Sequence, residues 1–331
     1  MVNRLNYIGS KHLLFDTIYK DILDKTGYET LKGRVVGDVF SGTGIVSWNM
    51  RQLGAETHSN DAELYSFYVT KAMALCCYTQ RIADVISGLN TDASRVSGFI
   101  TRTYSPYEGC ERQFFTIENA ERIDFMRNSI RAMDLSDHER AFLLASLVVS
   151  ADAVSNVPAV YGMYLKQFKA KALKTLVLLP VHTLDRLPEA LSTVQNLDVL
   201  QLVTPRMHVA YLDPPYNERQ YSKNYFPLNV ICGEDMAVHG KTGIPDECFV
   251  SPFCSRRVAA DVFEQLVERT NATWIFISYN SEGIVSRDAF TALLEKFGEV
   301  SVTEFDYKRF KSFSYNEDKR VTEYLFCLHK N

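Results

Sequence analysis

The tetrapeptide Asp213-Pro214-Pro215-Tyr216 follows the apolar run 207–212 and combines a carboxylate, two prolines and an aromatic ring. The prolines fix the backbone and remove two N–H donors, so their carbonyl groups remain as acceptors. The exocyclic amine of a base is a poor nucleophile, because its lone pair delocalises into the ring. Asp213 and the Pro214 carbonyl could each accept one amino hydrogen, and Tyr216 could stack on the base. The alternative is a rigid turn, or a cis-proline, with an aspartate cap.

A second motif, the loop 39–44 (VFSGTG), follows a strand-like run and opens a helical pattern. Its glycines let the backbone approach a ligand at a helix N-terminus. The loop is neither G-x-G-x-x-G nor a lysine-containing phosphate loop, so a pyrophosphate is not indicated. Asp61 ends the next predicted strand, where an acidic residue suits ribose hydroxyls. The combination predicts a nucleoside cofactor without a pyrophosphate, with S-adenosylmethionine as the candidate. The alternative is a tight strand–helix turn.

Alternating strands and helices must position these two motifs. Short apolar runs predict buried strands, and periods of 3.6 residues between them predict helices. This alternation indicates an α/β protein with a doubly wound sheet. Strands are expected at 34–40, 56–60, 207–212, 273–279 and 321–328, and helices at 11–24, 45–53, 62–77, 258–269 and 287–297.

The spacing of the strands predicts an insertion, because the mostly helical stretch from about 80 to 190 is too long for a loop. We therefore expect a discontinuous core, formed by 1–80 and 190–331, and an inserted helical subdomain at 81–189. A second insertion, 217–256, carries glycine, proline and asparagine and little periodicity.

The composition of the 331 residues is that of an ordinary globular protein, with 46% hydrophobic and 23% charged residues. The 36 Lys+Arg and 40 Asp+Glu give a net charge of −4, which argues against coating of nucleic acid by bulk charge. The seven cysteines form no C-x-x-C pair, so no metal site is expected. The N-terminus resembles no signal peptide, and no apolar run could span a membrane, so a cytoplasmic protein is expected.

The order of FSGTG, Asp61 and DPPY, after the N-terminal segment 6–11 (NYIGSK), resembles the D12 class of DNA adenine-N6 methyltransferases, the Dam-like alpha group. This resemblance implies a mostly parallel seven-stranded sheet, the fold of S-adenosylmethionine-dependent methyltransferases, with an inserted target-recognition subdomain. It places Tyr7 and Lys11 at the methionine part of the cofactor and Asp61 at the ribose. The other cofactor-binding residues that it implies are Asp38, Phe40, Ser41, Gly42, Gly44, Asp213 and, near the adenine, Asp198. Further family-like segments are 155–166, 278–281, Arg309 to Ser312 and 323–325.

An enzyme of this class must flip its target adenine out of duplex DNA. Asn217, Arg219, Gln220 and Tyr221 follow DPPY and could hold the flipped nucleotide or fill its gap. Local basic clusters could neutralise phosphates, although a charge run is often only a solvated surface. These clusters are Lys166, Lys169, Lys171 and Lys174; Arg256 and Arg257; and Lys308, Arg309 and Lys311.

The resulting prediction is a site-specific methyltransferase acting on adenine in double-stranded DNA, with Asp213, Pro214 and Tyr216 as catalytic residues. A cognate restriction endonuclease is a candidate partner. Cytosine-N4 methylation uses the same geometry, although aspartate rather than serine at position 213 favours adenine. Methylation of RNA and a catalytically idle DNA-binding module are further alternatives. The sequence has no Pro-Cys dipeptide, which disfavours a cytosine-C5 enzyme.

Overall fold

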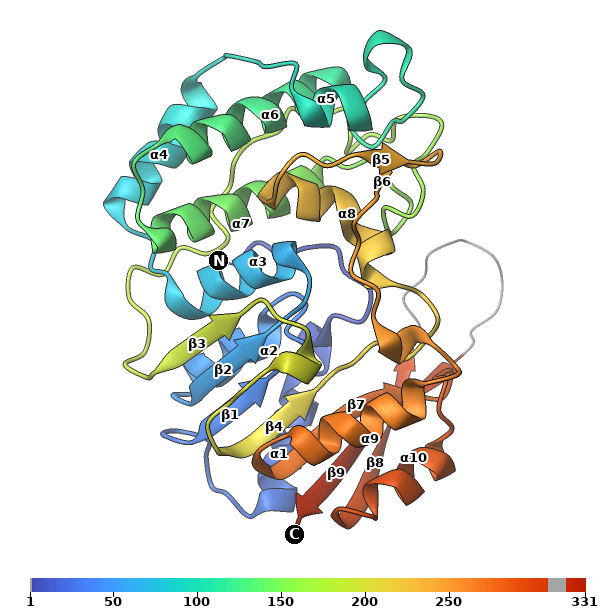
Figure 1. Ribbon diagram of the computed structural model, residues 1–331. Helices are drawn as coiled ribbons and strands as arrows, with labels where there is room; N and C mark the ends of the chain where they lie inside the picture. Colours follow the sequence, from blue (N-terminus) through green and yellow to red (C-terminus); the bar gives the residue numbers. More distant parts are fainter. Residues whose placement is uncertain (1, 309–319) are drawn as a thin grey trace. The chain divides into compact units, whose positions relative to one another are not determined.

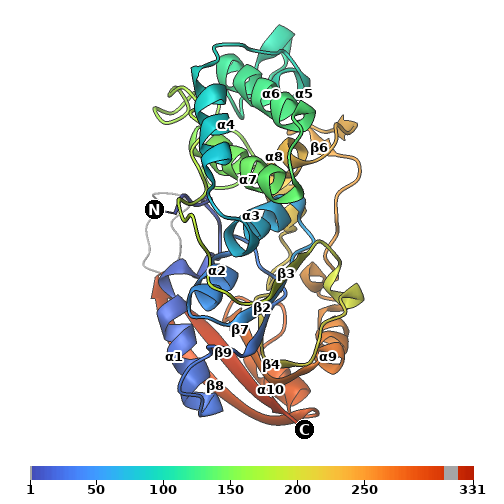
Figure 2. The ribbon, with the colours of Figure 1, turned by 90° about the vertical axis from the view of Figure 1, so that its left-hand side faces the viewer.

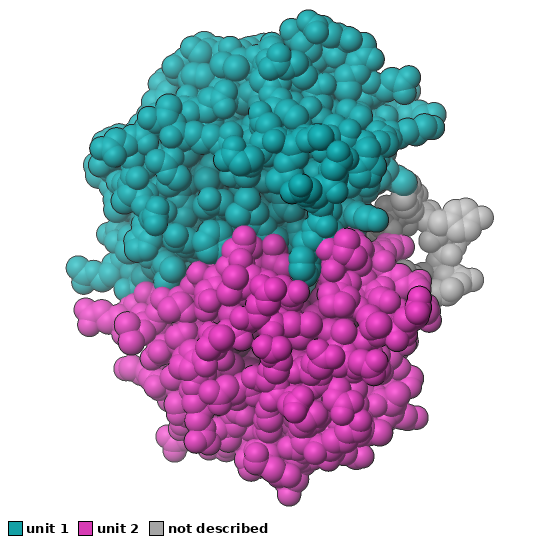
Figure 3. All heavy atoms as spheres, in the orientation of Figure 1, with its two compact units in different colours: residues 1–9, 63–187, 221–249 teal, residues 10–62, 188–220, 250–331 magenta. Residues whose placement is uncertain are grey.

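The computed structural model describes residues 2–308 and 320–331, and the chain divides into two compact units (Figures 1 and 3). The first unit contains residues 1–9, 63–187 and 221–249, and the second contains residues 10–62, 188–220 and 250–331. Each unit is thus assembled from segments that lie far apart in the sequence.

The second unit is built on a seven-stranded sheet with the order β3-β2-β1-β4-β7-β9-β8. All pairs from β3 to β7 are parallel, and β9 alone runs antiparallel to its neighbours β7 and β8. This mostly parallel sheet confirms the expected fold class. The strands are β1 (Val35–Asp38), β2 (Glu56–Asn60), β3 (Ser192–Gln195), β4 (Met207–Leu212), β7 (Ala272–Asn280), β8 (Gly298–Lys308) and β9 (Arg320–Lys330).

Helices cover both faces of this sheet. Figure 2 shows α1 (Phe15–Thr26) and α2 (Ile45–Gln52) on one face, and α9 (Ala259–Arg269) and α10 (Arg287–Leu294) on the other. The core beneath the second pair contains Phe263, Phe290, Ile275 and Phe326, all fully buried. Helix α9 follows the amphipathic pattern, because its buried residues recur at intervals of three and four positions. Short 3-10 turns also occur in this unit: η1 (Lys11–Leu13), η3 (Val199–Gln201) and η4 (Pro252–Cys254).

Two strands of the sheet, β3 and β8, were not expected from the sequence. Both are edge strands, and each pairs with a single neighbour. Strand β3 has the sequence STVQ, and in the first part of β8 polar and apolar residues alternate. A strand exposed on one side needs no continuous apolar run, so neither gave the signal of a buried strand.

The first unit is mainly helical, with α7 as its central helix. Helix α7 is buried continuously from Ala141 to Asp152, and it packs against α3, α6 and α8. It begins with a capping box, in which Ser136 and Glu139 satisfy each other's backbone N–H groups. The helices are α3 (Leu64–Leu75), α4 (Gln80–Thr91), α5 (Phe99–Tyr104), α6 (Ile117–Ala132), α7 (Asp137–Ala153) and α8 (Tyr221–Cys232), with η2 (Tyr107–Gly109) and the short strands β5 (Val238–His239) and β6 (Ile244–Pro245).

The helical pattern that we expected up to about residue 190 ends at α7, and 154–190 contains turns and extended segments. The segment 217–256 contains a helix that its weak periodicity did not predict. This helix, α8, contains Pro227 and a non-helical residue at Tyr225, which explains the weak signal. The first unit also contains residues 1–9 and 63–80, which the sequence analysis placed in the core. The assignment of target recognition to 81–189 stays a prediction. None of the helices in the described ranges is long and apolar enough to cross a bilayer.

Candidate active site

The sequence motifs of the second unit meet at the carboxyl edge of its sheet. Asp38 ends β1, Asp61 follows β2, Asp198 follows β3, and Asp213 follows β4. These four strands are consecutive neighbours in the sheet and run parallel. Open parallel sheets bind ligands at this edge.

The glycine loop has a conformation that requires glycine at two positions. Gly42 and Gly44 have φ angles of 51° and 72°, which side chains disfavour. The Gly44 N–H donates to the Ser41 carbonyl at 2.7 Å, which closes the turn before α2. The Gly42 N–H donates to Asp61 Oδ2 at 2.7 Å. Asp61, which was expected at the ribose, therefore also binds the glycine loop.

Asp38 lies beneath this loop and is 2% exposed. Its Oδ2 accepts hydrogen bonds from the Ser47 N–H at 2.9 Å and from the Ser47 hydroxyl at 2.5 Å. Burial raises the pKa of Asp38 to about 7, although the bonds from Ser47 oppose the shift. Asp38 thus fastens the first turn of α2 to the end of β1.

The loop after β3 is held against the loop after β2 by paired amides. The Asn60 side chain accepts from the Leu197 N–H at 3.1 Å and donates to the Leu197 carbonyl at 3.0 Å. Asn196 Nδ2 donates to the Asp61 carbonyl at 2.7 Å. Asp198 Oδ1 caps η3 by accepting from the Leu200 N–H at 3.0 Å. The carboxylates of Asp61 and Asp198 are therefore presented on adjoining loops.

These loops suit a nucleoside better than a phosphate. The segment 38–44 contains no lysine or arginine, whereas Asp61 and Asp198 offer acceptors for hydroxyl and amino groups. Phe40 at the same edge packs edge-to-face on Phe253, with 5.4 Å between the ring centroids. The residues present therefore fit S-adenosylmethionine, which is a nucleoside with a cationic sulfonium.

Asp213 forms a buried ion pair with Lys11. Lys11 Nζ lies 2.8 Å from Asp213 Oδ2, and the two side chains are 6% and 19% exposed. Burial lowers the pKa of Lys11, but the carboxylates of Asp213 and Glu323 outweigh this effect and raise it. Burial raises the pKa of Asp213, and Lys11 opposes that shift. Lys11 was expected at the methionine part of the cofactor, and the structure shows it bound to the carboxylate of DPPY.

Two residues near this pair belong to the family-like segments 278–281 and 323–325, but the sequence analysis predicted no site role for them. Asn280 ends β7 and faces Glu323 across the β7–β9 ladder, and Asn280 Nδ2 lies 3.4 Å from Glu323 Oε1. Asn280 opposes the rise in the pKa of Tyr216 that burial causes, and Glu323 helps to raise the pKa of Lys11. Their signal in the sequence is a polar residue at the end of a strand that is otherwise apolar.

The peptide bonds of residues 2–308 and 320–331 include no cis bond, so the cis-proline alternative for DPPY is wrong.

Tyr7 and Tyr221 belong to the first unit, where they stack with Tyr225. Ring centroids are 4.7 Å apart for Tyr7 and Tyr225, and 5.5 Å apart for Tyr7 and Tyr221. The Ile8 N–H donates to the Tyr225 hydroxyl at 2.9 Å. The Asn6 N–H donates to buried Asp152 at 2.9 Å. These contacts fix the N-terminal segment on α7 and α8.

Among the residues after DPPY, some side chains are exposed and others are hydrogen-bonded to backbone atoms. Arg219 is exposed, and its N–H donates to Asn217 Oδ1 at 3.0 Å. Gln220 bonds the backbone of Ser251 through both amide atoms, at 2.8 and 3.1 Å. Gln220 therefore closes the base of the segment 221–250, and the nucleotide contact expected for it stays a prediction.

The basic residues expected at DNA are distributed over both units. Arg256 and Arg257 are exposed in the second unit, and Arg256 pairs with Glu218 at 2.8 Å. Lys166 is exposed in the first unit. Lys169 donates to the Val157 carbonyl, and burial lowers its pKa to about 8. Lys169 thus also binds its own unit. Arg309, Lys311 and Ser312 lie outside the described residues.

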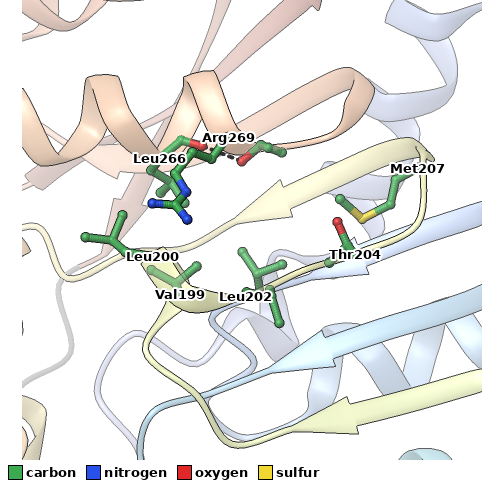
Figure 4. A pocket seen from close by; sticks show the side chains of 9 residues that line it. Val199, Leu200, Leu202, Thr204, Met207, Leu266 and Arg269 are labelled. Atoms are coloured by element: carbon green, nitrogen blue, oxygen red, sulfur yellow. Dashed lines mark hydrogen bonds between the residues drawn. The ribbon is translucent and has the colours of Figure 1, made fainter.

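A small pocket of the second unit lies between η3 and the end of α9 (Figure 4). Val199, Leu202, Leu266 and Met207 make most of its wall apolar. None of the residues predicted to act in catalysis or binding lines it, so we assign it no role.

The seven-stranded sheet, with its glycine loop and acidic side chains at the carboxyl edge, has the arrangement predicted for an S-adenosylmethionine-dependent methyltransferase. The family model of the D12 class N6 adenine-specific DNA methyltransferases matches residues 7–293. The chain belongs to this family. It is therefore an enzyme that methylates adenine in DNA with S-adenosylmethionine as cofactor, as predicted.

Relatives match over nearly the whole chain. The Type II methyltransferase M.CviAII of Paramecium bursaria Chlorella virus 1 is 38% identical, over 99% of both chains. The Type II methyltransferase M.NlaIII of Neisseria lactamica is 34% identical, over 98% of this chain and 99% of the relative. The Type II methyltransferase M.FokI of Planomicrobium okeanokoites is 32% identical, over 99% of this chain and 53% of the relative.

Proposed function

We propose that Asp213 and the Pro214 carbonyl accept the two amino hydrogens of the target adenine. The observation that supports this assignment is the ion pair of Asp213 Oδ2 with Lys11, which keeps the carboxylate ionised and leaves Oδ1 for the amine. Two acceptors direct the nitrogen lone pair toward the methyl donor, and they favour the positive charge that develops on nitrogen. Tyr216 stacks on the base.

The carboxyl-edge loops would hold the cofactor. S-adenosylmethionine supplies the methyl group as an electrophilic sulfonium. Asp61 would accept hydrogen bonds from the ribose hydroxyls while it holds the Gly42 N–H, and Asp198 would lie near the adenine. Phe40 supplies an apolar wall, and Asp38 acts from beneath by fixing α2. Tyr7, stacked on Tyr225, is proposed for the methionine part of the cofactor.

We propose that the enzyme flips its target adenine out of duplex DNA and contacts the DNA through exposed polar side chains. Arg219, Arg256 and Arg257 have the exposure that phosphate contacts need. Asn217 and Tyr221 follow DPPY in the sequence and are proposed for the flipped nucleotide or its gap. Lys166 and Lys169 are proposed as phosphate contacts in the first unit.

The relatives named Type II methyltransferases suggest a biological setting. We propose that this chain modifies a specific DNA site in a restriction–modification system, with a cognate endonuclease that cuts the unmodified site. Such a pair acts where the genome is held, which for a bacterial host is the cytoplasm.

Incubation with labelled S-adenosylmethionine and duplex DNA of varied sequence tests the proposal. We expect N6-methyladenine in the nucleoside digest, and sequencing of the product will locate the modified site. Asp213→Asn keeps the shape of the side chain and removes its charge, so we expect methyl transfer to fall about 100-fold or more with the fold retained. Turnover by this variant at the wild-type rate would refute the role of Asp213.

A further inference from the structure

The first part of strand β9 brings a second carboxylate to the same edge of the sheet as the catalytic motif. Glu323 on β9 pairs in register with Asn280 on β7, and β7 is the neighbour of β4, which leads into DPPY. Asn280 is 4% exposed, and its Nδ2 lies 3.4 Å from Glu323 Oε1. A buried amide between a carboxylate and the motif is a specific polar contact, because buried polar groups are costly unless paired.

Lys11 connects Glu323 to the carboxylate of DPPY. Lys11 Nζ binds Asp213 Oδ2 at 2.8 Å, and Glu323 contributes to holding the pKa of Lys11 above its ordinary value. The ammonium of Lys11 is therefore paired with Asp213 and is also attracted electrostatically by Glu323. This second attraction would help to hold Lys11 in place beside Asp213.

Asn280 also lies near the aromatic ring of the motif. Its Nδ2 lies 3.4 Å from Glu323 Oε1, its neighbour Tyr279 contacts the Tyr216 ring, and it opposes the rise in the pKa of Tyr216 that burial causes. Tyr279, the preceding residue of β7, lies edge-on to Tyr216, with ring centroids 6.3 Å apart. Glu323 thus lies next to Asn280 and acts electrostatically on Lys11.

We propose that Glu323, held by Asn280, is a positioning residue for methyl transfer that fixes Lys11 and thereby the orientation and charge of Asp213. The inference rests on the proposed role of Asp213. Glu323 touches neither the base nor the methyl donor in this proposal, and it acts on the chemical step through Lys11.

The charged and titratable groups that act on Glu323 determine the expected pH dependence. They are Lys11, Asp213 and Glu282, with Tyr216 close to the same group. Removing the negative charge of Glu323 leaves the field of Lys11 to act on Asp213 alone. The pKa of Asp213 should then fall, and the acid limb of kcat should move to lower pH.

The test compares Glu323→Gln with Glu299→Gln in the full chain. Glutamine preserves the size of Glu323 and its bond to Asn280, and Glu299 is an exposed residue of β8 that gives the same change of charge. For Glu323→Gln we expect kcat to fall about 10-fold or more, with the KM values for DNA and S-adenosylmethionine little changed. For Glu299→Gln we expect wild-type kinetics. Thermal unfolding establishes that both variants are folded.

Three outcomes separate the proposals. A lower kcat together with an acid limb at lower pH supports the positioning role, and Glu323→Asp should restore the limb because it restores the charge. Wild-type kcat and an unchanged pH profile in Glu323→Gln would overturn the inference while wild-type methylation still stands. Absence of methylation by the wild-type chain would instead overturn the proposed function itself.

Discussion

The substitution Lys11→Met tests the buried ion pair most directly. It keeps a long side chain of similar volume and leaves the Asp213 carboxylate without the ammonium that now lies 2.8 Å from Oδ2. Removing one member of a buried pair commonly costs about 3–5 kcal/mol, since the remaining charge has lost its partner. Asp213 is 19% exposed, so water can screen part of the charge. We therefore expect a loss of about 2–4 kcal/mol in the free energy of unfolding at pH 8.

The loss should depend on pH in a defined direction. The pKa of Asp213 is raised by burial, and Lys11 opposes the shift. Without Lys11 the pKa rises further, so the folded state binds the proton more tightly than the unfolded chain does. Stability is then lost as pH rises from the ordinary carboxylate value of about 4 toward the raised value. The variant should differ from wild type less at pH 5 than at pH 8.

Urea unfolding at pH 5 and pH 8 measures the loss in the free energy of unfolding and its dependence on pH. The comparison includes Asp213→Asn and the double variant, which isolate the coupling between the two side chains. Lys296→Met is the matched control. Lys296 Nζ lies 2.9 Å from Glu264 Oε2, a distance similar to that of the Lys11–Asp213 pair, but both of these side chains are well exposed. That surface pair should contribute less than about 1 kcal/mol. A loss for Lys11→Met no larger than for Lys296→Met, or one that is greater at pH 5, would refute the reasoning.

Two further substitutions probe the loop after β1. Because burial raises the pKa of Asp38 to about 7, wild type should lose about 2–3 kcal/mol as pH rises from 5 to 8, whereas Asp38→Asn should show a flatter dependence in urea unfolding. An equal slope in both proteins would contradict this assignment. Gly44→Ala forces a side chain to a φ angle of 72° and should cost about 1–2 kcal/mol in thermal unfolding. Gly88→Ala in α4, where an added Cβ meets nothing within 4 Å, should be neutral or stabilising, and the same loss at both glycines would count against the φ argument.

The sequence predicts the interior of the sheet well and its edges poorly. Strands β1, β4 and β7 lie between other strands, and their apolar runs mark them directly. Strands β3 and β8 pair on one side only, and polar residues are frequent in both, so local pattern cannot separate them from loops. The helix α8 was hidden for another reason, because Pro227 interrupts its periodicity.

The candidate site shows a similar division. The glycine loop and DPPY are local motifs, and the sequence alone predicts that each follows a strand. The partner of Asp213 could not be predicted, because Lys11 reaches it through the fold and not through spacing. For Gln220 and Lys169 the residue type suggested a contact with DNA. In the structure their side chains hydrogen-bond backbone atoms of their own unit.

The charge balance at the catalytic motif explains why a lysine is needed there. Asp213 and Glu323 are partly buried carboxylates whose pKa values burial raises, and Lys11 opposes that rise at both. With both carboxylates ionised, they and Lys11 together carry one net negative charge. That surplus matters because methyl transfer places positive charge on the amine nitrogen, and a fixed negative group close to it lowers the energy of the transition state. A neutral residue at position 11 would allow protonation of the acceptor, and a second cation would cancel the surplus.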